Sequence, residues 1–169
     1  MLAESFRFQK PTNAKPENVT SNFMKIVVNN IEFSFETWNE PDSKIWCATI
    51  HLSKYELDFI FDETLFWINE TGEIKIDWKL IEKFIENILN NIETIQQKGS
   101  EALEQLYGTL DFFEIGGIEL KKFDAQYFEY KTTYFLEPKK HALVNTGLSH
   151  YVYFSYKNDI LSINRAIRI

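Results

Sequence analysis

The feature that most constrains the fold is a change of hydrophobic period in the middle of the chain. Across residues 78–98 the apolar side chains recur at spacings of three and four, which predicts an amphipathic helix of roughly five turns. On either side of it, apolar and polar residues alternate as they do in strands with one buried face. A chain of this order is expected to pack its helix against a sheet. The helical set comprises Ile81, Phe84, Ile85, Ile88, Leu89, Ile92 and Ile95.

Both ends of this helix carry sequence signals. Asp77 predicts the start, because its carboxylate can accept hydrogen bonds from the free amides of the first turn. Gly99 predicts an end at Lys98, because glycine adopts the left-handed C-cap conformation at little cost. Ser100 would then cap a second, shorter helix. The apolar residues of that helix would be Ala102, Leu103, Leu106 and Tyr107.

The segments before the helix predict a meander of strands. Residues 25–28 and 31–38 flank Asn29 and Asn30, which tolerate the positive φ of a two-residue turn. Further strands are expected at 45–52 and 58–62, and a hairpin at 66–76. In the 31–38 strand, the buried face would hold Ile31, Phe33 and Phe35, and the wet face Glu32, Ser34 and Glu36.

After residue 112 the strand pattern returns and ends in a hairpin over 150–169. The expected fold class is therefore α+β: a mostly antiparallel sheet with one long and one short helix packed on it, in the order β-meander, two helices, β-hairpins. Strands and helices do not alternate, which excludes a doubly wound nucleotide-binding fold.

The length of 169 residues suits a single domain. Residues 24–169 are expected to form it, and the proline- and asparagine-containing segment 1–23 is expected to be an N-terminal arm that is mobile in part. One cysteine rules out an internal disulfide framework and fits a reducing compartment. No apolar run suffices for a membrane span or a signal peptide, so we expect a cytoplasmic protein without membrane attachment.

Catalytic signatures are absent from the sequence, so no catalytic residue, metal ligand or cofactor is assigned. No histidine pair has helical spacing, and there is no Cys-x-x-Cys motif or phosphate-binding glycine loop. The segment around Ser149 lacks the second glycine of a nucleophile elbow. His141 and His150 could converge only through the fold. Cys47 lies among apolar strand neighbours, and we expect it to be buried and inert.

Charge is distributed unevenly along the chain. The overall formal charge is −7, but residues 26–120 hold nineteen acids against six bases, and both flanking segments are net positive. An acidic field repels nucleic-acid phosphates and attracts cationic partners. The C-terminal tyrosines could suggest an RNA platform, but no RNP-like motif is present and we expect them to pack within the sheet. We therefore predict no nucleic-acid partner.

The acids are densest at 56–77, where Lys75 is the single opposing base. One interpretation is a solvated face of an ordinary acidic protein. The other is a docking surface for a basic protein, in which aromatic residues serve as anchors within a charged rim. The candidate partner surface comprises Glu56, Asp58, Asp62, Glu63, Phe66, Trp67, Glu70 and Glu73.

The layout of residues 24–169 resembles a group of small uncharacterised bacterial α+β domains, some of which resemble immunity proteins of toxin systems. The resemblance rests on the acidic balance, on Trp67 before the helix and on the final hairpin over 151–169. It implies no catalytic residues. It implies a partner that is a basic protein, such as a toxin.

Three functional hypotheses follow. The favoured one is a non-enzymatic cytoplasmic binding protein, an immunity-type inhibitor that docks a basic partner by electrostatic steering. The second is a small-molecule-binding or enzymatic domain with a sheet-cleft site near His141 and His150. The third is a structural interaction module. Homo-oligomerisation is left open by the sequence.

Overall fold

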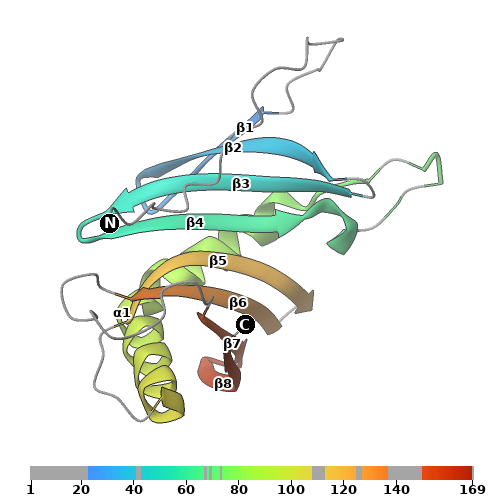
Figure 1. Cartoon of the computed structure of the whole chain (residues 1–169). Coiled ribbons are helices and arrows are strands. Elements are labelled where there is room, and N and C mark those ends of the chain that lie inside the picture. Colours follow the sequence, from blue (N-terminus) through green and yellow to red (C-terminus); the bar gives the residue numbers. More distant parts are fainter. Residues whose placement is uncertain are drawn as a thin grey trace, which may run out of the picture.

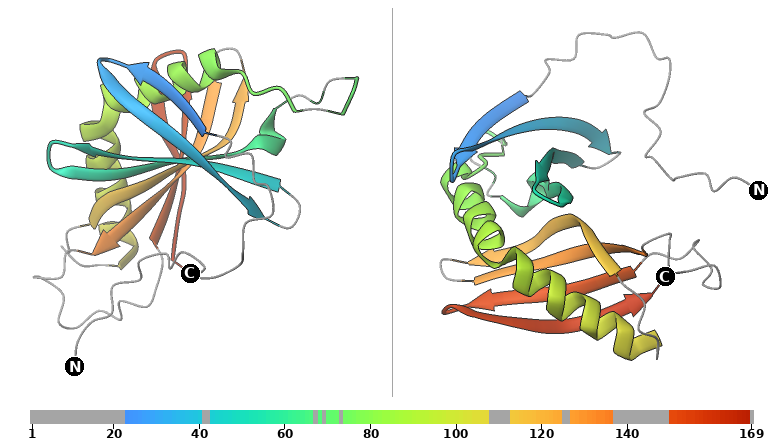
Figure 2. Two further views of the ribbon diagram at one scale, coloured as in Figure 1. Left: turned by 90° about the horizontal axis from the view of Figure 1, so that it is seen from above. Right: turned by 90° about the vertical axis from the view of Figure 1, so that its left-hand side faces the viewer.

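The described part of the chain folds as one curved sheet with a single long helix lying along one of its faces (Figures 1 and 2). The computed structural model describes residues 23–40, 43–66, 68, 70–72, 74–107, 113–124, 127–136 and 150–168. The predicted N-terminal arm, except for Phe23, lies outside these residues. The strands are β1 Phe23–Val28, β2 Ile31–Glu40, β3 Ser43–Leu52, β4 Tyr55–Asp62, β5 Phe113–Asp124, β6 Tyr127–Leu136, β7 His150–Lys157 and β8 Ile160–Arg168.

The sheet is mixed, and its strand order follows the chain from β1 to β8. All neighbouring strands pair antiparallel except β4 and β5, which run parallel. A parallel pair cannot be joined by a tight turn and needs a long crossover. A 3₁₀ turn, η1 Glu63–Leu65, and the helix α1 Trp78–Tyr107 supply it. The hairpin expected at 66–76 is reduced to one isolated bridge between Ile68 and Ile74.

The prediction of two helices is wrong. α1 is one continuous helix of 30 residues that passes through both Gly99 and Ser100. Gly99 is present because Tyr134 packs against the helix at that point: a Cβ on residue 99 would lie 1.8 Å from the Tyr134 hydroxyl oxygen. Ser100 is buried within the helix, and its hydroxyl donates to Glu104 at 3.1 Å. The glycine therefore marks a close contact with the sheet and not a helix end.

Other local predictions are confirmed. Asp77 caps the helix, with its carboxylate 3.2 Å from the amide of Leu80. Asn29 and Asn30 both adopt positive φ in the β1–β2 turn. The helical apolar stripe is buried apart from Leu89, which is half-buried.

The core lies between α1 and the inward face of the strands, where alternate residues from β1 to β7 are buried and β8 contributes Leu161. Aromatic rings fill the end nearest the start of the helix, where Trp78 packs 5.1 Å from Trp46 and 5.8 Å from Phe61. Because β1 to β7 pack their inner faces into this core, the opposite face of these strands remains for solvent or a partner. In the described part of the chain, no helix is long and apolar enough to span a bilayer.

The contact at Gly99 predicts that a glycine-to-alanine change here has the opposite effect on stability to the one usual in a helix. An alanine usually stabilises a helix interior relative to glycine by about 1 kcal/mol. We expect Gly99→Ala instead to destabilise the protein by about 1–3 kcal/mol, because the new methyl group overlaps the Tyr134 side chain. Denaturant melts are the measurement, with Asn90→Ala at an exposed helical position as the matched control. In a Tyr134→Leu background, Gly99→Ala should become neutral or stabilising. A more stable Gly99→Ala variant in the wild-type background would contradict the packing described.

Candidate functional site

Three of the predicted acids share one face of the sheet. Glu56, Asp58 and Asp62 occupy alternate positions on β4 and point away from α1, onto what we call the outer face. Their cross-strand neighbours on β3 are His51, Thr49 and Ile45, respectively. The strand alternation that buries Leu57, Phe59 and Phe61 thus places these carboxylates together on the outside.

β2 adds two residues that the sequence analysis did not include in the candidate partner surface. Glu36 pairs with Cys47 of β3, and Trp38 pairs with Ile45, both on the outer face. Trp38 is 45% exposed although it is a large aromatic residue. The signal was in the sequence, since extending the wet face of this strand by one further step reaches Trp38. We define the acidic face as Glu36, Trp38, Glu56, Asp58 and Asp62.

Two of these carboxylates have internal hydrogen-bond partners. Asp58 accepts from the Thr49 hydroxyl at 2.6 Å. Asp62 caps η1, where its Oδ1 accepts from the backbone amide and the hydroxyl of Thr64, both at 2.8 Å. Burial raises the pKa of Asp62, but these hydrogen bonds, one from Ser43 and the charge of Lys121 lower it by more, so its pKa lies below the ordinary value. The carboxylate therefore stays charged and fixed in orientation.

Of the remaining predicted surface residues, the structure describes Glu63, Phe66 and Glu70. Phe66 is only 6% exposed and packs 5.6 Å from Phe61 and 5.2 Å from Phe123, so it belongs to the core and cannot serve as an exposed anchor. Glu63 is half-buried in η1, and Glu70 is exposed in the turn that follows. The other two, Trp67 and Glu73, lie outside the described residues.

Cys47 lies on the outer face and is half-buried, which corrects the expectation that it belongs to the core. Burial, together with the negative charges of Asp58 and Glu36, raises the pKa of its thiol to about 12. A thiol in this electrostatic setting is protonated at neutral pH and is a poor nucleophile. Its expected inertness thus rests on its acidic neighbours as well as on burial.

The histidines do not form a cleft site within the described residues. His150 is 2% exposed and packs 5.2 Å from Phe113 on the helix side of the sheet. His141 lies outside the described residues. His51 is exposed on the outer face, 3.9 Å from Glu56. In the described part of the chain, no three histidine, cysteine or acidic side chains gather as metal ligands.

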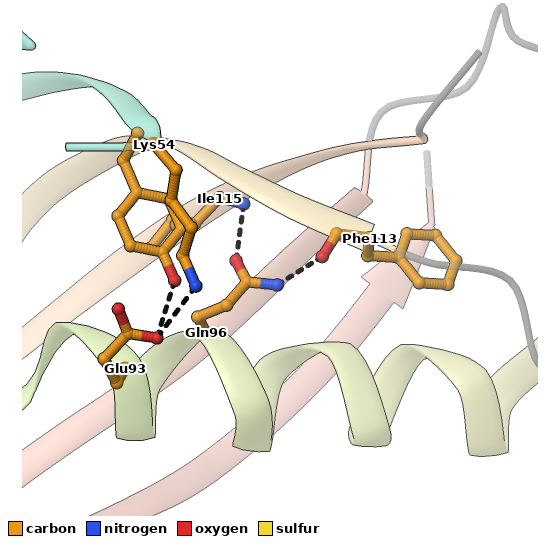
Figure 3. A network of polar contacts seen from close by, with 6 residues as sticks. Lys54, Glu93, Gln96, Phe113 and Ile115 are labelled. Atoms are coloured by element: carbon orange, nitrogen blue, oxygen red, sulfur yellow. Dashed lines mark hydrogen bonds and ion pairs between the residues drawn. The ribbon is translucent and has the colours of Figure 1, made fainter. Parts of the chain in front are cut away.

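A network of polar side chains links α1 to the sheet (Figure 3). Glu93 accepts from the Tyr55 hydroxyl at 2.9 Å and from Lys54 at 3.2 Å. The buried Gln96 side chain donates to the backbone carbonyl of Phe113 and accepts from the amide of Ile115 at 2.8 Å. The side-chain amide of Gln96 thus bonds to the backbone of β5 as a neighbouring strand would. The network braces the crossover and is not arranged for chemistry, because its donors and acceptors serve one another.

The C-terminal half of the outer face carries mixed charge. Glu119 forms ion pairs with Lys121 and, at 2.5 Å, with Lys131. Burial raises the pKa of Glu119, but the hydrogen bonds and charges of both lysines lower it by more, so the net shift is downward. Lys131 also lies 4.8 Å from the centre of the Tyr151 ring. Glu119 is thus locally compensated, whereas the outer positions of β2 to β4 carry no lysine or arginine.

Comparison with known proteins gives no family for this chain: no family model matches it, and searches of curated proteins and of solved structures find no significant match.

The electrostatics around Cys47 can be measured by thiol labelling, since the chain has a single cysteine. We expect slow labelling of the native protein at pH 8 and fast labelling after unfolding, because the thiol pKa is about 12 in the fold against an ordinary 9.0. Asp58→Asn should lower this pKa and speed native labelling, whereas the remote change Glu93→Gln should not. Native labelling as fast as that of the unfolded chain would rule out this description.

The contribution of Gln96 can be measured in the same way as that of a core residue. Gln96→Leu removes the partner of two backbone groups of β5, and we expect it to lower the free energy of unfolding by roughly 1–3 kcal/mol. Gln97→Leu, one position along and bonded only to Glu101 at the surface, is the control and should change stability by less than about 0.5 kcal/mol. Equal effects of the two changes in denaturant melts would show that the brace is unimportant.

Proposed function

We propose that the chain is a non-enzymatic protein-binding domain that docks a cationic protein on its acidic face. One observation carries the proposal. The outer positions of β2, β3 and β4 present Glu36, Glu56, Asp58 and Asp62 without a single lysine or arginine, beside the exposed ring of Trp38.

The carboxylates and the tryptophan of this surface are expected to contribute to binding in different ways. Uncompensated carboxylates on one face attract a cationic partner over about a Debye length and speed its association. They add less to the lifetime of the complex, because charges at an interface rim remain hydrated. A large exposed tryptophan supplies apolar area and a ring face for cations, and such residues dominate binding energy when a partner covers them. The acids therefore steer, and Trp38 anchors.

An immunity-type inhibitor is the form of this proposal that the sequence resemblance favours. Such a protein blocks a basic toxin by occupying its surface and needs no catalytic group of its own. A cytoplasmic location would suit that role and the single unpaired cysteine. Asp62 keeps its charge under mildly acidic conditions because its pKa is lowered, so steering would persist there.

Charge reversal with a matched control tests the steering role. Glu36→Lys with Glu56→Lys should slow association with the captured partner and flatten its salt dependence. Glu82→Lys with Glu86→Lys changes the net charge equally on the exposed side of α1 and should have a much smaller effect. The measurement is capture of partners from a lysate of the source cell, followed by kinetics with the purified partner.

The anchoring role has a separate readout. Trp38→Ala should leave association nearly unchanged and raise the dissociation rate, by a loss on the order of 2 kcal/mol. Trp38→Phe should retain part of the binding free energy that Trp38→Ala loses. The proposal fails if the wild type captures no cationic protein, or if the wild type, the charge reversal on β2 and β4 and Trp38→Ala capture the same partners at the same salt concentration.

A further inference from the structure

Two buried polar atoms at the helix–sheet interface have no hydrogen-bond partner among the described residues. One is the hydroxyl of Tyr130 on β6, a residue with 0% exposure. The other is Oδ1 of Asn87 on α1, which is buried although the residue as a whole is half-buried. Leaving either atom unpaired in an apolar interior costs free energy comparable to a lost hydrogen bond.

The fold places these atoms in the same region. Tyr134 reaches the carbonyl of Ile95 with its hydroxyl at 2.8 Å. Tyr130 lies four residues earlier on the same face of β6, about 13 Å along the strand, a length that spans about nine residues of helix. This span of helix runs from Ile95 toward the start of α1, because the centre of the Tyr130 ring lies 5.9 Å from that of Phe84. Asn87 is one helical turn beyond Phe84 on the same side of α1.

The surroundings limit what could fit between them. The Tyr130 ring stacks on Phe154 with centres 5.6 Å apart, so aromatic groups flank the hydroxyl. Burial also raises the pKa of Tyr130 far above its ordinary value, which keeps the phenol neutral and able to donate. The hydrogen bond to Asp159 raises the pKa of Tyr156, and a smaller opposing effect comes from a hydrogen bond with the Asn87 side chain. A bond that lowers the pKa of a phenol is donated to its oxygen, so the Asn87 amide nitrogen is directed there and Oδ1 is left to accept.

We propose that Tyr130 and Asn87 form a buried binding site for one water molecule, which accepts a hydrogen bond from the Tyr130 hydroxyl and donates one to Asn87 Oδ1. Water combines both functions in the smallest volume, and buried waters occur where polar groups would otherwise be unpaired. The site joins the first half of α1 to β6 through a polar link, as the direct bond from Tyr134 does for the second half.

The direction in which Tyr130→Phe changes the unfolding equilibrium constant shows whether the hydroxyl has a water partner or none. If water occupies the site, Tyr130→Phe should raise the unfolding equilibrium constant about fivefold, because a satisfied hydrogen bond is lost. Tyr134→Phe is the matched control, since its hydroxyl has a protein partner and its loss must destabilise in either case. If the Tyr130 hydroxyl is unpaired, Tyr130→Phe should leave the constant unchanged or lower it.

Two further measurements make the test specific. The double variant Asn87→Leu, Tyr130→Phe should raise the unfolding equilibrium constant by less than the product of the two single fold-changes, because both changes break bonds to the same molecule. NMR cross-relaxation between bulk-exchanging water and the Tyr130 ring protons should be present in the wild type and absent in Tyr130→Phe. The proposal is overturned by a neutral or stabilising Tyr130→Phe, by additive effects without such cross-relaxation, or by a native mass above that of the chain that shows a larger occupant.

Discussion

The parallel pairing of β4 and β5 is the constraint on which the rest of the fold depends. Phe59 and Ile118 are register partners of two strands that run in the same direction, so the chain must travel back along the sheet between them. A helix of 30 residues is about 45 Å long and makes that return with length to spare. The single continuous helix, the core beneath it and the free outer face all follow from this one crossover.

A long helix laid on a twisted sheet needs contacts that fix its position, and the second half of α1 has several of different kinds. Tyr134 fits against Gly99 and bonds to the carbonyl of Ile95, so one side chain sets both the distance and the rotation of the helix. Gln96 pairs with the backbone of β5. Lys98 reaches the carbonyl of Leu161 on β8 at 3.2 Å. Polar and steric contacts thus supplement the apolar stripe, which by itself allows sliding.

The periodicities of the sequence sufficed for the strands of the sheet, the helix start and its buried face, because these depend on nearest neighbours along the chain. They also predicted a hairpin at 66–76, where the described residues show one isolated bridge. Gly99 shows why the helix end could not be predicted: a glycine required by a side chain from a distant strand has the same local pattern as a C-cap glycine. Phe66 and Trp38 show the same limit at the site. Phe66 sits beside acids in sequence but is covered by Phe123, whereas Trp38 is aromatic and yet solvent-exposed because of its place in the alternation. Burial of an aromatic residue is decided by which face its strand commits to the core, and the neighbouring charges do not reveal it.

Within the described residues, the two halves of the outer face differ in how their acidic side chains are paired with bases. Around Glu119 the carboxylate is neutralised by Lys121 and Lys131, an arrangement that folding alone explains. On β2–β4 the outer positions carry Glu36, Glu56, Asp58 and Asp62 and no lysine or arginine, although Lys121 of the neighbouring β5 lowers the pKa of Asp62. Burial raises the pKa of the Cys47 thiol, and the charges of Asp58 and Glu36 raise it further. Carboxylates of like charge on one face oppose the folded state, and the exposed contact of Glu56 with His51, 3.9 Å away, offsets this only weakly. Binding of a cation would turn this unfavourable potential into a favourable one, and for that reason we propose the acidic face, and not the half around Glu119, as the docking surface.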